Sequence, residues 1–184
     1  MLMVFISPPV NDVSLNNKEF FTKNRYVNLQ IFLKDSDETE LLGSLLWQVL
    51  PEKCLVFLLG DLGAGKTTLI RGLLRATGHC GVVRSPTYSL VEEYRLGGRN
   101  VFHFDLYRLK DPEELEWMGM NDYLNQSSLC CIEWPQMGEG FLPNADVTID
   151  IAVEADARVI EINILAPEVK NKLQELWKNK DILI

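Results

Sequence analysis

Residues 60–67 read Gly60-Asp61-Leu62-Gly63-Ala64-Gly65-Lys66-Thr67, and this stretch decides the fold class of the chain. It matches the pattern G-x-x-x-x-G-K-(S/T), in which glycines let consecutive backbone N–H groups converge on phosphate oxygens. Lys66 is expected to reach the β and γ phosphates of a nucleotide, and the Thr67 hydroxyl is expected to hold Mg²⁺. Thr68, the next residue, is included in the predicted nucleotide-binding set. The stretch therefore predicts a phosphate-binding loop.

The sequence on both sides of the loop supports this interpretation. Lys53 to Leu59 is a short apolar run of the kind that is buried on both faces in a parallel sheet. Apolar residues at helical spacing follow the loop: Leu69, Ile70, Leu73 and Leu74. The order strand, glycine loop, helix is the context that this motif requires, and it argues against a glycine turn that precedes a lysine by chance.

The remaining patterns predict an α/β fold, a P-loop NTPase three-layer sandwich with a mostly parallel central sheet and a C-terminal antiparallel hairpin. Further strands are expected at 27–33, 88–94, 100–105 and 129–133, and the hairpin at 147–153 and 158–165. Helices are expected over 41–49, between a cap at Ser36 or Asp37 and Pro51, near Pro112, and over 167–178. We expect one ATPase domain over 25–184, preceded by an irregular arm over 1–24.

Charge, apolar runs and cysteine content limit the classes of function that the protein can have. The 184 residues include 26 acidic and 18 basic side chains, a formal net charge of -8, which argues against unaided binding to nucleic acid. The apolar run 54–59 is far shorter than the ~20 residues of a membrane-spanning helix, so no membrane association is expected. The 4 cysteines form no C-x-x-C pair and are expected to be buried free thiols in a reducing cytoplasm. Cys130 and Cys131 should point to opposite faces of one strand.

Two predicted strands end in a carboxylate, Asp105 and Glu133. Ligands of open parallel sheets lie outside the carboxyl ends of the strands, so both side chains are candidates for metal binding. Asp105 is expected to bind Mg²⁺ directly or through water, and Glu133 to complete the metal shell or orient the attacking water. The division of roles between them stays open, and a solvated strand end or a helix cap is the alternative for either one.

For three other residues near these strands, the sequence indicates a functional role less specifically. Thr87, in Ser85-Pro86-Thr87-Tyr88, is a candidate for sensing the γ phosphate through Mg²⁺, although an ordinary turn is the alternative. Trp134 could stack on a base or pack into the core. Arg108 could pair with a carboxylate or a phosphate, or lie at the surface.

Four ordered motifs of this sequence resemble those of the TsaE family, the bacterial ATPases of tRNA threonylcarbamoyladenosine synthesis. Its Walker A, switch I, switch II and Walker B motifs look like residues 60–67, 85–88, 103–108 and 132–135. The resemblance extends over roughly residues 27 to 165. Tyr88 stands where the family usually has Phe, and Gln136 and Met137 replace an acidic and a basic residue.

The resemblance implies an ATPase that binds ATP with Mg²⁺ and works with the partner proteins TsaB and TsaD. ATP binding or hydrolysis, slow without the partners, would support threonylcarbamoyl transfer to adenosine 37 of tRNA, which this subunit would meet only through the complex. Thr87, Asp105 and Glu133 become catalytic or metal-linked residues, and Trp134 lies beside the nucleotide. A cytoplasmic monomer or weak homo-oligomer is expected.

Two other functions remain open on the residues: a small-molecule kinase, and a binding module that uses a nucleotide without hydrolysing it. A GTPase is disfavoured, because the guanine-reading pattern N-K-x-D is absent from the sequence.

Overall fold

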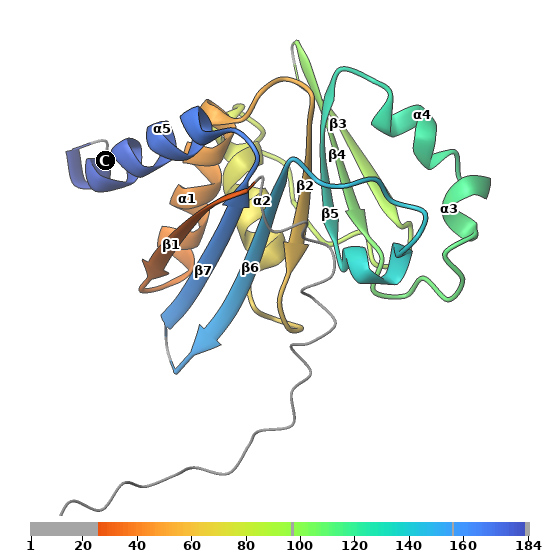
Figure 1. Cartoon of the computed structure of the whole chain (residues 1–184), viewed down its shortest axis with the longest axis horizontal. Coiled ribbons are helices and arrows are strands. Elements are labelled where there is room, and N and C mark those ends of the chain that lie inside the picture. Colours follow the sequence, from red (N-terminus) through yellow and green to blue (C-terminus); the bar gives the residue numbers. More distant parts are fainter. Residues whose placement is uncertain (1–25, 97, 156, 183–184) are drawn as a thin grey trace, which may run out of the picture.

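The computed structural model describes residues 26–96, 98–155 and 157–182, so the arm expected over 1–24 lies outside the described residues. The centre of the fold is a 7-stranded sheet with the order β1-β7-β6-β2-β5-β4-β3 (Figure 1). The strands are β1 (Val27–Leu33), β2 (Cys54–Leu59), β3 (Val91–Leu96), β4 (Arg99–Asp105), β5 (Ser128–Glu133), β6 (Val147–Glu154) and β7 (Ala157–Ile164).

The middle of this sheet is parallel and its two sides are antiparallel. Strand β2 pairs in parallel with β5 and with β6, and β5 pairs in parallel with β4. Strands β6 and β7 form the expected C-terminal antiparallel hairpin, β1 adds to β7, and β3 pairs antiparallel with β4. The predicted α/β fold with a parallel centre is confirmed.

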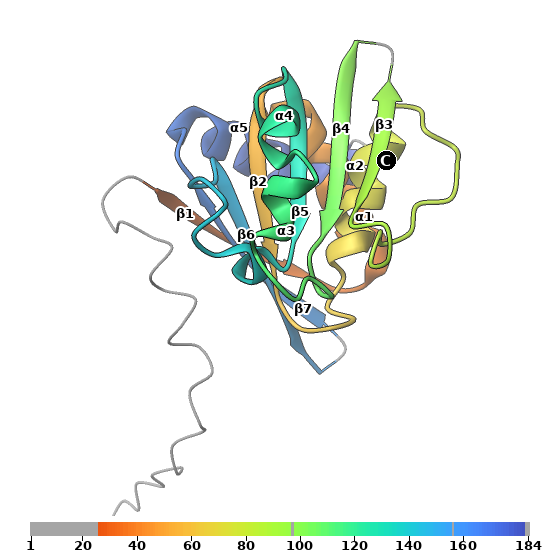
Figure 2. The same ribbon diagram turned by 90° about the vertical axis from the view of Figure 1, so that its right-hand side faces the viewer.

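Helices cover both faces of the sheet (Figures 1 and 2). On one face lie α1 (Ser36–Val49), α2 (Lys66–Ala76) and α5 (Pro167–Lys178), and on the other lie the short helices α3 (Glu114–Trp117) and α4 (Met120–Leu124). Short 3-10 helices, η2 (Pro135–Gly138) and η3 (Lys180–Ile182), follow β5 and α5. None of the described helices has the length and apolar character needed to cross a membrane.

Side-chain alternation along the central strands separates two apolar clusters. In β4, Val101 packs in the cluster under α1 and α2, whereas Phe102 packs in the cluster under α3 and α4. In β5, Cys131 joins the first cluster and Cys130 the second, as predicted for adjacent residues of a strand. By the same period of two, Asp105 and Glu133, the last residues of β4 and β5, lie on the α2 face.

Helix α2, which follows the predicted phosphate loop, is fixed against α1 by two glycines. A Cβ atom on Gly43 would lie 2.0 Å from the Leu69 carbonyl oxygen, and one on Gly72 would lie 1.9 Å from the Glu40 carbonyl oxygen. The backbones of α1 and α2 therefore approach more closely than any larger residue allows. The Arg71 side chain adds an ion pair to the Glu40 carboxylate at 2.8 Å.

Some predicted boundaries were wrong. The N-cap of α1 is Asp35, not Ser36 or Asp37, because the Asp35 side chain accepts the Glu38 N–H at 2.9 Å. Strand β3 begins at Val91 rather than at residue 88, because residues 86–90 form a turn. Leu90 has a positive φ of 63° there, and its N–H donates to the Pro86 carbonyl oxygen at 2.7 Å.

Candidate nucleotide site

The loop 60–67 joins the carboxyl end of β2 to the start of α2. Gly60, Gly63 and Gly65 have φ values of 122°, 80° and 118°, a region that side-chain-bearing residues rarely adopt. A Cβ atom on Gly60 would also lie 2.4 Å from the Ile151 carbonyl oxygen of β6. The backbone therefore folds as the motif predicts, with the amino end of α2 directly behind the loop.

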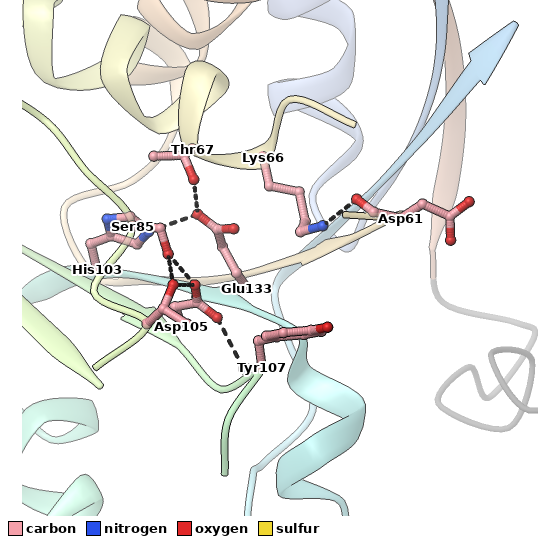
Figure 3. A network of polar contacts seen from close by, with 9 residues as sticks. Asp61, Lys66, Thr67, Ser85, His103, Asp105, Tyr107 and Glu133 are labelled. Carbon is pink, nitrogen blue, oxygen red and sulfur yellow. Dashed lines mark hydrogen bonds and ion pairs between the residues drawn. The ribbon is translucent and has the colours of Figure 1, made fainter. Parts of the chain in front are cut away.

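Lys66 points back into its own loop (Figure 3). Its Nζ donates to the carbonyl oxygens of Gly60 at 2.6 Å and Asp61 at 2.8 Å. Burial lowers the pKa of Lys66 from its usual value, and the opposing attraction of the Glu133 and Asp105 carboxylates is smaller. The ammonium is thus held at the centre of the loop by oxygens that a phosphate can replace.

The Glu133 carboxylate connects the loop to the sheet. Its Oε1 accepts the Thr67 hydroxyl at 2.8 Å and lies 2.9 Å from Nε2 of His103. Only 3% of Glu133 is exposed, so both contacts are shielded from bulk water. Thr67 and Glu133, two of the predicted site residues, are therefore in contact at the end of β5.

The Asp105 carboxylate has different partners, although Asp105 and Glu133 lie side by side in the register of β4 and β5. Its Oδ2 accepts the hydroxyls of Ser85 and, at 2.7 Å, of Thr87. Its Oδ1 accepts the backbone N–H of Tyr107 at 2.9 Å. Asp105 thus ties the 85–87 segment to the chain that follows β4 (Figure 3).

Two aromatic contacts border the site. Trp134, which has a positive φ of 58°, lies with its ring centroid 4.1 Å from Nζ of Lys66 and 5.0 Å from the Tyr107 ring. The Arg108 guanidinium lies 4.5 Å from the ring centroid of Tyr88, which is 85% exposed. Trp134 therefore packs on the phosphate-loop lysine, and Arg108 packs on an exposed tyrosine.

These groups surround a cavity of about 400 Å³. Of the predicted site residues, it is lined by Leu62, Gly63, Gly65, Lys66, Thr67, Thr68, Thr87, Asp105, Glu133 and Trp134. Gly60, Asp61 and Ala64 belong to the same loop without lining the cavity, and Ala64 is buried.

The sequence analysis assigned no functional role to His103, Ser85 or Tyr107. In the structure each of them contacts the carboxylate of Glu133 or Asp105. A signal for His103 was available, because it precedes Asp105 by two residues in a predicted strand and so shares its face. Ser85 had no such signal, since its contact with Asp105 depends on the path of an irregular segment.

The oxygen atoms of the site fit Mg²⁺. Thr67, Glu133 and Asp105 offer hydroxyl and carboxylate oxygens, the ligands that this ion prefers. In the described parts of the chain, no group of three or more His, Cys, Asp or Glu residues could hold a metal. The set therefore suits an ion bound by a few side chains together with phosphates rather than by a protein cage.

Comparison with known proteins agrees with this geometry. A family model described as "Threonylcarbamoyl adenosine biosynthesis protein TsaE" matches residues 33–160. The TsaE protein of Haemophilus influenzae is 59% identical over 108 residues, which cover 59% of this chain and 68% of that protein. The TsaE protein of Bacillus subtilis is 33% identical over 124 residues, which cover 67% and 77% of the two chains.

A solved structure supports the fold independently. The crystal structure of Bacillus subtilis YdiB has a TM-score of 0.69 and 25% sequence identity, and it covers 84% of this chain and 97% of that chain. The family match includes the phosphate loop and both carboxylates, and it spans more than half of the sequence. The chain therefore belongs to the TsaE family of threonylcarbamoyl adenosine biosynthesis proteins.

Proposed function

We propose that this protein is a Mg-ATP-binding ATPase subunit for the N6-threonylcarbamoyl modification of adenosine 37 in tRNA, and that it acts as a nucleotide switch on a complex of TsaB and TsaD. One observation carries the ATPase part: the cavity is bordered by a phosphate loop with its lysine, a threonine hydroxyl and two carboxylates. Family membership supports the tRNA part. The protein would act in the cytoplasm and meet tRNA through the complex.

Lys66 and the backbone N–H groups of 60–67 would bind the phosphates of ATP, with the Lys66 ammonium exchanging the Gly60 and Asp61 carbonyls for phosphate oxygens. Thr67, Glu133 and Asp105 would hold Mg²⁺ directly or through water. The ion would neutralise negative charge on the phosphates. The Thr67 hydroxyl can keep donating its hydrogen to Glu133 while an oxygen lone pair faces the metal.

The switch would use the contact between Asp105 and the 85–87 segment. Thr87 donates to Asp105, and both residues line the cavity, so a γ phosphate and its metal ion would compete for the same groups. Loss of the γ phosphate would return the Thr87 hydroxyl to Asp105. Tyr88 and Arg108, which pack on each other, lie next to this contact. A change in the contact would therefore alter the position of the exposed Tyr88 at the surface beside the cavity.

The test is ATP turnover by the purified protein, with and without TsaB, TsaD and tRNA. We expect ADP and free phosphate to form slowly with the protein by itself and faster in the complex, and Lys66→Ala to remove both activities. Phosphorylation of an added small molecule would replace the proposal with a kinase. Binding of ATP without ADP formation, even in the complex, would replace it with a non-hydrolysing binding module.

A further inference from the structure

We propose that His103 is a positioning residue for hydrolysis, which fixes the direction of the Glu133 carboxylate from beneath the cavity. The inference rests on the proposed function and deepens it. The His103 side chain is fully buried at 0% exposure, and its Nε2 lies 2.9 Å from Oε1 of Glu133. It does not line the cavity, so it would act through Glu133 and not on the nucleotide.

The sheet explains why the two residues meet. In the parallel pair β4·β5, His103 lies opposite Cys131 and Asp105 lies opposite Glu133. His103 and Glu133 point to the α2 face, one pleat apart along the strands. In the view of Figure 3 the Glu133 carboxylate lies between His103 on one side and Lys66 on the other.

The direction of the hydrogen bond follows from the acceptor. An ionised carboxylate only accepts, so Nε2 of His103 carries the hydrogen and Nδ1 is left with a lone pair. That assignment agrees with the surroundings, because Nδ1 is buried and has no hydrogen-bond partner among the described residues. An N–H at Nδ1 would instead be a buried donor without an acceptor, which is the more costly arrangement.

The two donors converge on one oxygen of Glu133. Oε1 accepts from both Thr67 and His103, whereas no described residue donates to Oε2. Since Glu133 lines the cavity, this arrangement leaves Oε2 available to a water molecule or to the metal shell. Thr67 is also a proposed metal ligand, whereas the His103 side chain has the Glu133 carboxylate as its one hydrogen-bond partner among the described residues.

A purely structural role would not require a histidine here. The same face of β4 and β5 is otherwise apolar below the carboxylates, with Val101, Leu129 and Cys131 in the cluster under α1 and α2. An apolar residue would fill this position without leaving a bare nitrogen in the core. The imidazole is therefore explained by its bond to Glu133.

The test compares amide variants of different reach. In His103→Gln the side-chain amide nitrogen can occupy the place of Nε2, whereas in His103→Asn it is too short. We expect His103→Asn to lower kcat for ATP, measured with TsaB and TsaD present, by about 10- to 100-fold, the usual effect of losing an outer-shell partner. KM for ATP should stay close to that of the wild type, because His103 does not line the cavity, and His103→Gln should restore most of kcat.

Controls separate this inference from the proposed function. His79→Asn alters the other histidine, whose ring packs on Tyr94, and should leave kcat unchanged. If His103→Asn fails to fold in thermal unfolding, His103→Leu replaces it as the variant without a donor. Equal kcat in the wild type, the donor-free variant and His103→Gln would overturn the role of His103 alone, whereas no turnover in the wild type would overturn the proposed function and this inference with it.

Discussion

At the scale of single residues, the Lys66 ammonium donates to two oxygens of its own loop, the Gly60 and Asp61 carbonyls, at 2.6 and 2.8 Å. A triphosphate offers charged partners in their place. We expect Lys66→Ala to weaken Mg-ATP binding by about 10- to 100-fold in calorimetry, since a hydrogen bond to a charged group contributes about 1.5–3 kcal/mol. Lys172→Ala, an exposed lysine on α5, is the matched control. Wild-type affinity in Lys66→Ala would contradict the proposed role of this lysine.

Trp134 gives an optical signal for the same event. Its ring centroid lies 4.1 Å from Nζ of Lys66, so movement of the ammonium toward phosphates removes a cation from the ring face. We expect Mg-ATP to change the tryptophan emission of the wild type and to leave that of Trp134→Phe unchanged. Trp117→Phe, on the other face of the sheet, should keep the change. An emission unchanged at saturating Mg-ATP in the wild type would argue against the position of Trp134 beside the nucleotide.

At the scale of elements, the α1·α2 crossing determines where the phosphate loop lies. A Cβ atom on Gly72 would come within 1.9 Å of the Glu40 carbonyl oxygen, and backbone cannot yield as a flexible side chain does. We expect Gly72→Ala to lower the free energy of unfolding by about 1–3 kcal/mol in urea, the cost of overpacking, and to weaken Mg-ATP binding by moving α2.

Gln48→Ala, at an exposed position of α1, is the control for the crossing and should stay within about 0.5 kcal/mol of the wild type. Unchanged stability in Gly72→Ala would mean that the two helices can separate at no cost, contrary to the role assigned to their glycines.

Elements with a strong periodic pattern could be predicted from the sequence. The buried run of β2, the hairpin β6·β7 and the bounds of α5 agree with apolar spacing and proline position. Helix α4, with only 5 residues, was missed, because such a length is too short for a period to repeat. The turn at Pro86 and Thr87 was foreseen, but its continuation to Leu90 was missed, because residues 88–94 have the composition of a strand.

The candidate site was predictable as a set of residues but not as a set of bonds. The motif identifies Lys66 and Thr67, and strand ends identify Asp105 and Glu133. Which carboxylate meets the Thr67 hydroxyl depends on the order of β2, β5 and β4 in the sheet. That order results from the packing of the whole chain, so local sequence does not contain it.

At the scale of the whole molecule, the burial of the cysteine side chains shows how well the helices shield the sheet from solvent. Cys54, Cys130 and Cys131 are buried, whereas Cys80 is exposed, so the expectation of buried thiols was wrong for Cys80. Cys80 follows the end of α2, outside the sheet. Burial raises the pKa of Cys54 to about 12 and that of Cys131 well above its usual value, so their thiolates are scarce at neutral pH.

A thiol reagent should therefore modify Cys80 rapidly in the native protein and the three buried cysteines only when the sheet opens. We expect the modification to proceed in a fast phase and a slow phase. The fast phase should be absent in Cys80→Ser. The slow phase should become fast in urea and should be slowed by Mg-ATP. If opening is global and ATP binds only the folded state, ATP at 100 times its Kd stabilises by about 2.7 kcal/mol and slows this phase about 100-fold. Cys54 and Cys131 lie in β2 and β5, the strands that lead into the loop and to Glu133, so rapid modification of either in the native protein would contradict the enclosed sheet on which the site is built.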